Sequence, residues 1–247
     1  MASVSGGSRY GKYLSRVIAR RPDGRLEIGL LLAFLASACL LLAFGKLASE
    51  MIEGETAGFD TAVLLAFRSA ANPADPLGPV WLQSAVRDVS AMGSFVVLGF
   101  ISLSAIFYLF MVEKRMMAML VAASVIGGVL LSNALKLGFA RPRPDFVPEL
   151  DLFTYSFPSG HAMLSAVTYL TLGALLAEAH PSRRVKIYFL TLAFLVTVAV
   201  GISRVYLGVH YPSDVLAGWC VGAVWALLCG TVVLYLRRRT SRAEHPI

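Results

Sequence analysis

The chain has 247 residues, of which 57% are hydrophobic and 15% are charged, whereas soluble domains average about 45–50% apolar and about 25% charged residues. This composition excludes an ordinary soluble domain, and it also excludes a disordered chain, which needs low hydrophobicity and high charge. Three cysteines are too few for a disulfide-rich secreted module, and the formal net charge of +7 is explained below by its position along the chain.

Six apolar runs are long enough to cross a bilayer, which takes about 17–25 residues in a helix. None shows the alternation of a barrel strand, so each is predicted to be a transmembrane helix. The runs are Ile28 to Leu47, Gly93 to Val112, Met116 to Leu135, Ala162 to Ala179, Ile187 to Ile202 and Val215 to Leu236. The predicted fold class is therefore all-α, an integral membrane bundle of six transmembrane helices.

A long loop, Ala48 to Met92, separates the first two runs. Within it, Ala62 to Ala71 is apolar but too short to span, and Asn72-Pro73 ends it. We expect an extracytoplasmic interfacial helix here, with a helix packed on the bundle as the alternative.

The basic residues indicate the orientation, because cytoplasmic loops retain Lys and Arg. Fifteen of the 22 Lys and Arg residues lie before the first run, after the sixth, or in the loops that follow the second and fourth runs. Both termini are therefore predicted to be cytoplasmic in the inner (plasma) membrane, and the positive charge is a topology signal that predicts no nucleic-acid partner. The predicted organisation is a cytoplasmic basic segment (1–25), a six-span domain (26–236) and a cytoplasmic basic tail (237–247).

Three polar segments, 136–144, 158–161 and 203–214, fall at span ends on the predicted outer side. Charged groups near hydrocarbon are costly and usually mark a site. Lys136 and Arg143 follow the third run and are cations for such a site, although either could be an anchor that extends to the interface. We assign that anchoring role to the neighbouring Arg141.

The other two polar segments add a helix start and a possible nucleophile. Ser159, Gly160 and His161 open the fourth run, where free amides favour an anion, although Ser-Gly is also a common helix cap. His210 and Asp214 are four residues apart, so the carboxylate can orient the imidazole for attack, or simply bond it structurally. Together with Arg204, the set suits a phosphoryl group. It suits a metal poorly, because carboxylates are few and no HExxH motif is present.

Read in order, these segments resemble the three-part signature of the type-2 phosphatidate phosphatase superfamily, the lipid phosphate phosphatases. KxxxxxxRP matches Lys136 to Pro144, PSGH matches Pro158 to His161, and SRxxxxxHxxxD matches Ser203 to Asp214. The resemblance implies a metal-independent phosphatase without a cofactor that forms a phosphohistidine intermediate. It implies that His210 is the nucleophile, Asp214 its partner, and His161 the acid and then the base. The phosphate oxygens would be held by Lys136, Arg143, Ser159, Gly160 and Arg204.

The implied substrate is a membrane lipid phosphate at the extracytoplasmic face, with the bilayer as the only other partner and no obligate protein partner evident. Undecaprenyl diphosphate, phosphatidylglycerophosphate, phosphatidate and lipid A phosphates remain open, because the motifs contact phosphate and not the lipid tail. A lipid phosphotransferase that uses the same site is the alternative. An anion transporter is disfavoured, because the polar cluster sits at one surface and not at mid-span.

Overall fold

The computed structural model describes residues 24–70, 72–145 and 155–243, with side chains for 28–70, 72–145 and 155–232. In this part of the chain every secondary-structure element is a helix and no strand is formed, so the predicted all-α fold is confirmed. The helices are α2 (Gly24–Glu53), α3 (Ala57–Ala66), α4 (Val80–Ala91), α5 (Phe95–Met111), α6 (Arg115–Phe139), α7 (Gly160–Ala179), α8 (Arg183–Tyr206) and α9 (Pro212–Ala243). Most of the predicted N-terminal basic segment, and residues 244–247 of the tail, lie outside the described residues.

The six predicted spans correspond to six long helices, and the protein is a multi-pass membrane protein. Five of them, α2, α6, α7, α8 and α9, are each long and apolar enough to cross a bilayer. The sixth, α5, has 17 residues and follows α4 at a bend of 45°. Helix α7 is central, since 56% of its apolar 18-residue stretch is buried inside the protein. The corresponding share is 6% for the peripheral α2.

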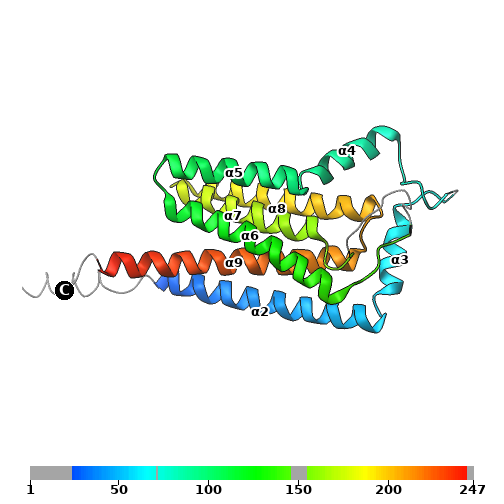
Figure 1. The fold of residues 1–247 in the computed structure, drawn as a ribbon, viewed down its shortest axis with the longest axis horizontal. Coiled ribbons are helices and arrows are strands. Elements are labelled where there is room, and N and C mark those ends of the chain that lie inside the picture. The colour runs from blue at the N-terminus through cyan, green and yellow to red at the C-terminus, as the bar shows by residue number, and fades with distance from the viewer. Residues whose placement is uncertain (1–23, 71, 146–154, 244–247) are drawn as a thin grey trace, which may run out of the picture.

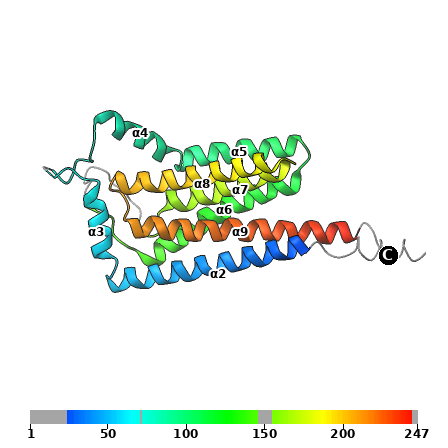
Figure 2. The same cartoon turned by 180° about the vertical axis from the view of Figure 1, so that it is seen from behind.

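The long helices run side by side, and α3 lies across one end of the bundle (Figure 1). Helix α9 finishes at the opposite end, as the view from behind also shows (Figure 2). The ends of α6 and α8 and the starts of α7 and α9 all lie at the α3 end. This arrangement brings the three polar segments predicted from the sequence to one end of the molecule.

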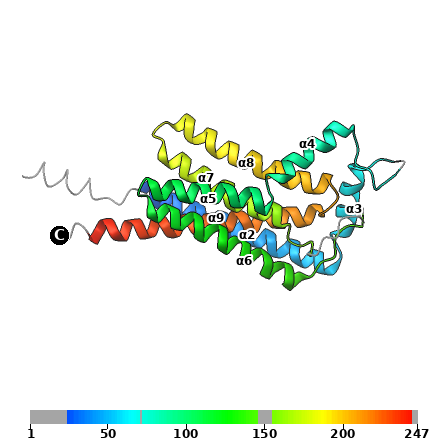
Figure 3. The same ribbon diagram turned by 45° about the horizontal axis from the view of Figure 1, so that its top comes forward.

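The loop between α2 and α5 folds differently from its prediction. The predicted helix, Ala62 to Ala71, is displaced to Ala57–Ala66, because the chain leaves the helix at Phe67 and Arg68 donates a hydrogen bond to the Tyr206 carbonyl oxygen at 2.9 Å. A second helix, α4, was not predicted and packs on α8 (Figure 3).

Helix α3 packs on the bundle, which was the alternative expectation for this segment. Leu64 is fully buried and packs in a cluster with Ala162 and Val215, so the helix packs on the bundle end. Phe59 and Leu65 on the same helix remain about half exposed. An exposed apolar surface of this kind suits a membrane interface.

Two glycines in α9 allow its backbone to touch α7. A Cβ atom added at Gly218 would lie 2.7 Å from the Ser159 carbonyl oxygen, and one at Gly222 would lie 2.5 Å from the Met163 carbonyl oxygen. Small residues at such spacing are how membrane helices approach closely. The contact holds the first turn of α7 against the first part of α9.

We expect Gly218→Ala to destabilise the protein by about 1–3 kcal/mol, because the added methyl group must push the two helices apart. Gly230→Ala is the matched control, since Gly230 is in the same helix and nothing lies within 4 Å of its added Cβ. Thermal unfolding in detergent compares the two. Equal midpoints for both variants would contradict the proposed close contact.

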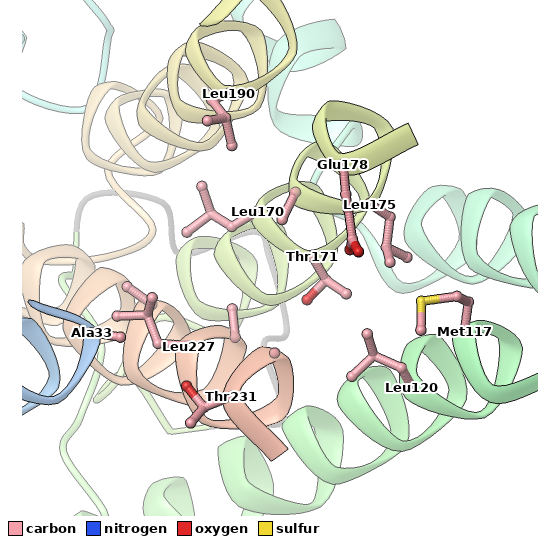
Figure 4. A pocket seen from close by; sticks show the side chains of 14 residues that line it. Ala33, Met117, Leu120, Leu170, Thr171, Leu175, Glu178, Leu190, Leu227 and Thr231 are labelled. Carbon is pink, nitrogen blue, oxygen red and sulfur yellow. The ribbon is translucent and has the colours of Figure 1, made fainter. Parts of the chain in front are cut away.

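A cavity of about 410 Å³ lies between the helices in the half of the bundle away from α3. Its lining is almost entirely apolar, with Thr171, Glu178 and Thr231 as polar exceptions (Figure 4). None of the predicted site residues lines it. This cavity is therefore not the predicted phosphate site.

Candidate active site

His210 and Asp214 meet at the start of α9. Pro212 begins the helix, and its fixed φ angle suits that position. His210 Nδ1 lies 3.5 Å from Asp214 Oδ2 and 3.3 Å from Ser156 Oγ. Its other nitrogen, Nε2, lies 3.1 Å from Arg143 Nη1. A guanidinium only donates, so Nε2 carries the lone pair and Nδ1 carries the proton.

His210 is buried, with 1% of the residue exposed. Burial lowers the pKa of this imidazole to about 3, and the nearby Arg143 and Arg204 act in the same direction, while Asp214 acts against them. A lowered pKa favours the neutral ring at every pH above that value. The Nε2 lone pair is therefore present at neutral pH, as nucleophilic attack requires.

The three predicted cations approach the site from three segments. Arg143 also donates to the Val209 carbonyl oxygen at 2.7 Å, beside the histidine. Lys136, in the last turn of α6, donates to the Tyr155 carbonyl oxygen at 2.5 Å. Arg204, near the end of α8, donates from Nη1 to Ser90 Oγ at 2.6 Å, and its buried Nε has no hydrogen-bond partner among the described residues.

The start of α7 supplies further donors. The Ser159 amide donates to the Asp214 carbonyl oxygen at 2.9 Å, which ties this turn to α9. The Ser159 hydroxyl is buried and finds no partner in the described part of the chain. A Cβ atom added at Gly160 would lie 3.4 Å from Lys136 Cε, so the lysine passes directly over the first residue of α7.

His161 is the second residue of α7 and is partly exposed. Its ring lies within electrostatic range of His210 and of all three cations. Helix α7 is also backed here by Gly93, where an added Cβ atom would lie 3.3 Å from His161 Cβ and Cδ2. The two histidines and the cations therefore belong to one cluster.

The cluster can bind an anion. Buried donors without a partner are costly, and they indicate an unseen acceptor. Ser159 Oγ and Arg204 Nε are two such donors beside a helix N-terminus, which attracts phosphate. In the described residues, no three His, Cys, Asp or Glu side chains lie close enough together to hold a metal ion.

One interpretation from the sequence was wrong. Arg141 was expected to be an anchor that reaches the membrane interface, but its side chain is 12% exposed and bridges two buried carboxylates. Arg141 Nη1 lies 2.7 Å from Asp214 Oδ1, and Nη2 lies 2.8 Å from Asp60 Oδ2. Helix α6 ends at Phe139, Ala140 then takes a left-handed conformation with a φ of 47°, and Arg141 follows this turn into the cluster.

Three further residues were missed. Ser156 donates to Asp214 Oδ2 at 2.5 Å, Ser90 accepts from Arg204, and Asp60 accepts from Arg141. They lie outside the three motifs, on separate segments, and only tertiary packing brings them to the site. The one usable signal was Asp60, an acidic residue within an otherwise apolar stretch.

Known proteins are similar to this chain in sequence and in fold. The model of the PAP2 superfamily matches residues 117–238. Phosphatidylglycerophosphatase B of Bacillus subtilis is 43% identical over 95 residues, which are 38% of this chain and 46% of that protein. Lipid A 1-phosphatase of Rhizobium etli is 35% identical over 125 residues, 46% of this chain and 48% of that protein. The chain thus matches about half the length of each of these curated relatives.

The crystal structure of a transmembrane PAP2 type phosphatidylglycerolphosphate phosphatase from Bacillus subtilis has the same fold. Its TM-score is 0.73 at 28% identity, and the match covers 81% of this chain and 96% of that one. All three sequence motifs fall within the segment that the family model matches. Residues 117–238 of the chain therefore form a domain of the PAP2 superfamily, as the motifs predicted.

Proposed function

We propose that the protein is a metal-independent phosphatase that hydrolyses a phosphate monoester or diphosphate of a membrane lipid through a phosphohistidine on His210. One observation carries the proposal: the His210 lone pair on Nε2 points toward Arg143 while Nδ1 faces Asp214. The nucleophile thus faces a cation that can hold the phosphate it attacks. The names of the relatives, which are phosphatases of lipid phosphates, support the substrate class.

In the first step, His210 Nε2 attacks phosphorus, and the bond from phosphorus to the lipid oxygen breaks. His161 gives its proton to the leaving oxygen. Asp214 stabilises the positive charge that develops on the His210 ring. Lys136, Arg143 and Arg204, with Ser159 and the Gly160 amide, hold the three equatorial oxygens, where charge is spread in the transition state.

In the second step, water attacks the phosphohistidine on the side that the lipid has left. His161 takes a proton from this water, and the bond from phosphorus to Nε2 breaks. Inorganic phosphate leaves, and His210 returns to its neutral form. The same histidine is thus the acid in one step and the base in the other, as microscopic reversibility requires for a symmetrical double displacement.

We place this chemistry at the extracytoplasmic face of the inner membrane, with both termini cytoplasmic. The distribution of Lys and Arg supports this orientation, since the site lies at the bundle end opposite the basic end of α9. A substrate can then keep its tail in the outer leaflet while its phosphate enters between α7, α8 and α9. Helix α3, with Phe59 and Leu65 exposed, would rest on that leaflet.

The proposal is tested by phosphate release from purified protein in detergent, with a chelator present. The panel contains prenyl diphosphate, phosphatidate, phosphatidylglycerophosphate and lipid A. Release from at least one lipid is expected. If phosphate moves to an added lipid alcohol and not to water, the protein is a phosphotransferase; if folded protein acts on none of them, the proposal is wrong.

Vanadate should inhibit competitively, because it adopts the trigonal bipyramid of the transition state and would bond to His210 Nε2. Inhibition is measured against phosphate release at several substrate concentrations. EDTA, the control treatment, should leave the activity unchanged. Loss of activity with EDTA that a divalent metal restores would contradict the proposed metal-independent chemistry.

A further inference from the structure

Asp60 on α3 is a fully buried carboxylate outside the segment that the family model matches. It accepts hydrogen bonds from the Ser213 amide at 2.9 Å, from Ser213 Oγ at 2.6 Å and from Arg141 Nη2 at 2.8 Å. A buried carboxylate is tolerated only when it is paired in this way. These bonds connect α3 to the first turn of α9, where Asp214 lies.

Arg141 lies between Asp60 and Asp214. Its Nη1 contacts Asp214 and its Nη2 contacts Asp60. The guanidinium carbon also lies 4.1 Å from the centre of the Tyr211 ring. Burial acts to lower the pKa of Arg141, but Asp214 and Asp60 more than offset this and raise it above the usual value. The guanidinium is therefore charged and fixed in place.

The charges of Asp60, Arg141 and Asp214 act together on His210. If Arg141 were paired with Asp214 alone, the two charges would cancel, and the carboxylate would attract a cationic imidazole less strongly. Asp60 adds a second negative charge, so the three groups together carry a net charge of −1. The other charged or titratable groups that face His210 are Arg143, Arg204 and His161.

We propose that Asp60 is a positioning residue for the phosphatase reaction, acting through Arg141 to keep a net negative charge beside His210 at Asp214. The inference rests on the proposed function, because the positive charge that it stabilises forms when Nε2 bonds to phosphorus and the lipid oxygen leaves with the proton from His161. Helix α3 thereby takes part in the chemistry as well as in packing.

Asp60→Asn is the direct test, because the amide has the same shape: its oxygen can accept from the Ser213 amide and its nitrogen can donate to Ser213 Oγ, while the acceptor for Arg141 is lost. We expect kcat to fall roughly 10- to 100-fold, with little change in KM, since the lost interaction strengthens only in the transition state. Asp88→Asn is the matched control, because it makes the same change of charge at an exposed residue of α4. It should retain wild-type kcat and KM.

The double variant Asp60→Asn/Arg141→Met separates charge from structure. It removes one negative and one positive charge, so Asp214 again carries the net charge of −1. We expect its kcat to exceed that of Asp60→Asn by about tenfold, a departure from additivity expected of coupled residues. A purely structural role would instead lower the thermal unfolding midpoint of Asp60→Asn and leave the kcat of the folded protein unchanged.

Each outcome decides between the alternatives. Wild-type kcat in Asp60→Asn, or a double variant no more active than Asp60→Asn, overturns the inference while the proposed function stands. No phosphate release by folded wild-type protein overturns the proposed function itself. If Asp60→Asn does not fold, the double variant decides alone: activity within about tenfold of wild type supports the inference, and a loss as complete as in His210→Ala overturns it.

Discussion

His210→Ala should abolish phosphate release, with a loss on the order of 10⁴-fold or more, because no other group can form the covalent intermediate. The ring lies between Asp214 and Arg143 and is buried, so water or a neighbouring side chain cannot take over the attack with the same geometry. The measurement is the rate of phosphate release from the best lipid of the panel.

His180→Ala is the matched control for this prediction. His180 follows the last turn of α7, at the other end of that helix from His161, and its ring contacts Phe189 and none of the site residues. It should retain wild-type turnover. A folded His210→Ala variant with more than a few per cent of wild-type activity would contradict the proposed nucleophile.

His161→Ala should lower turnover of lipid substrates by roughly 10²–10⁴-fold, the usual contribution of a general acid and base. The loss should depend on the leaving group. An aryl phosphate such as 4-nitrophenyl phosphate needs no proton on its leaving oxygen, so the first step should survive in the variant while hydrolysis of the phosphohistidine remains slow.

We therefore expect His161→Ala to release one equivalent of nitrophenol rapidly and then to stall. Stopped-flow absorbance measures this burst, and the His161→Ala/His210→Ala variant is the control that should show none. An equal loss of activity toward lipid and aryl phosphates, without a burst, would show that His161 does not act on the leaving group.

Much of the fold could be predicted from the sequence, because the bilayer leaves few choices. An apolar run of about 20 residues has to be a helix, since no water is present to pair its backbone groups. This constraint predicted the six long helices but not α4, whose mixed sequence has no such requirement. The sequence also placed α3 five residues too late, because the end of that helix is set by the contact of Arg68 with the Tyr206 backbone.

The candidate site was predictable only where local spacing determines the geometry. His210 and Asp214 are one helical turn apart, and the Ser159 to His161 segment opens a helix, so their arrangement could be anticipated. The positions of Asp60 and Ser156 could not be anticipated, because they come from other segments of the chain. Ser156 contacts Asp214 directly, and Asp60 contacts it through Arg141. Arg141 shows the limit most clearly. In the sequence it is a cation beside a transmembrane run and resembles an interfacial anchor. In the structure it is buried between Asp60 and Asp214, which two other helices supply.

The central claim is the bond between phosphorus and His210, and a quenched single turnover tests it directly. The protein is mixed briefly with lipid labelled in its phosphate, quenched in base and digested. The account predicts a base-stable, acid-labile label on the peptide that contains His210, absent from His210→Ala. A label on another residue, or full turnover with no labelled protein at any time, would contradict it.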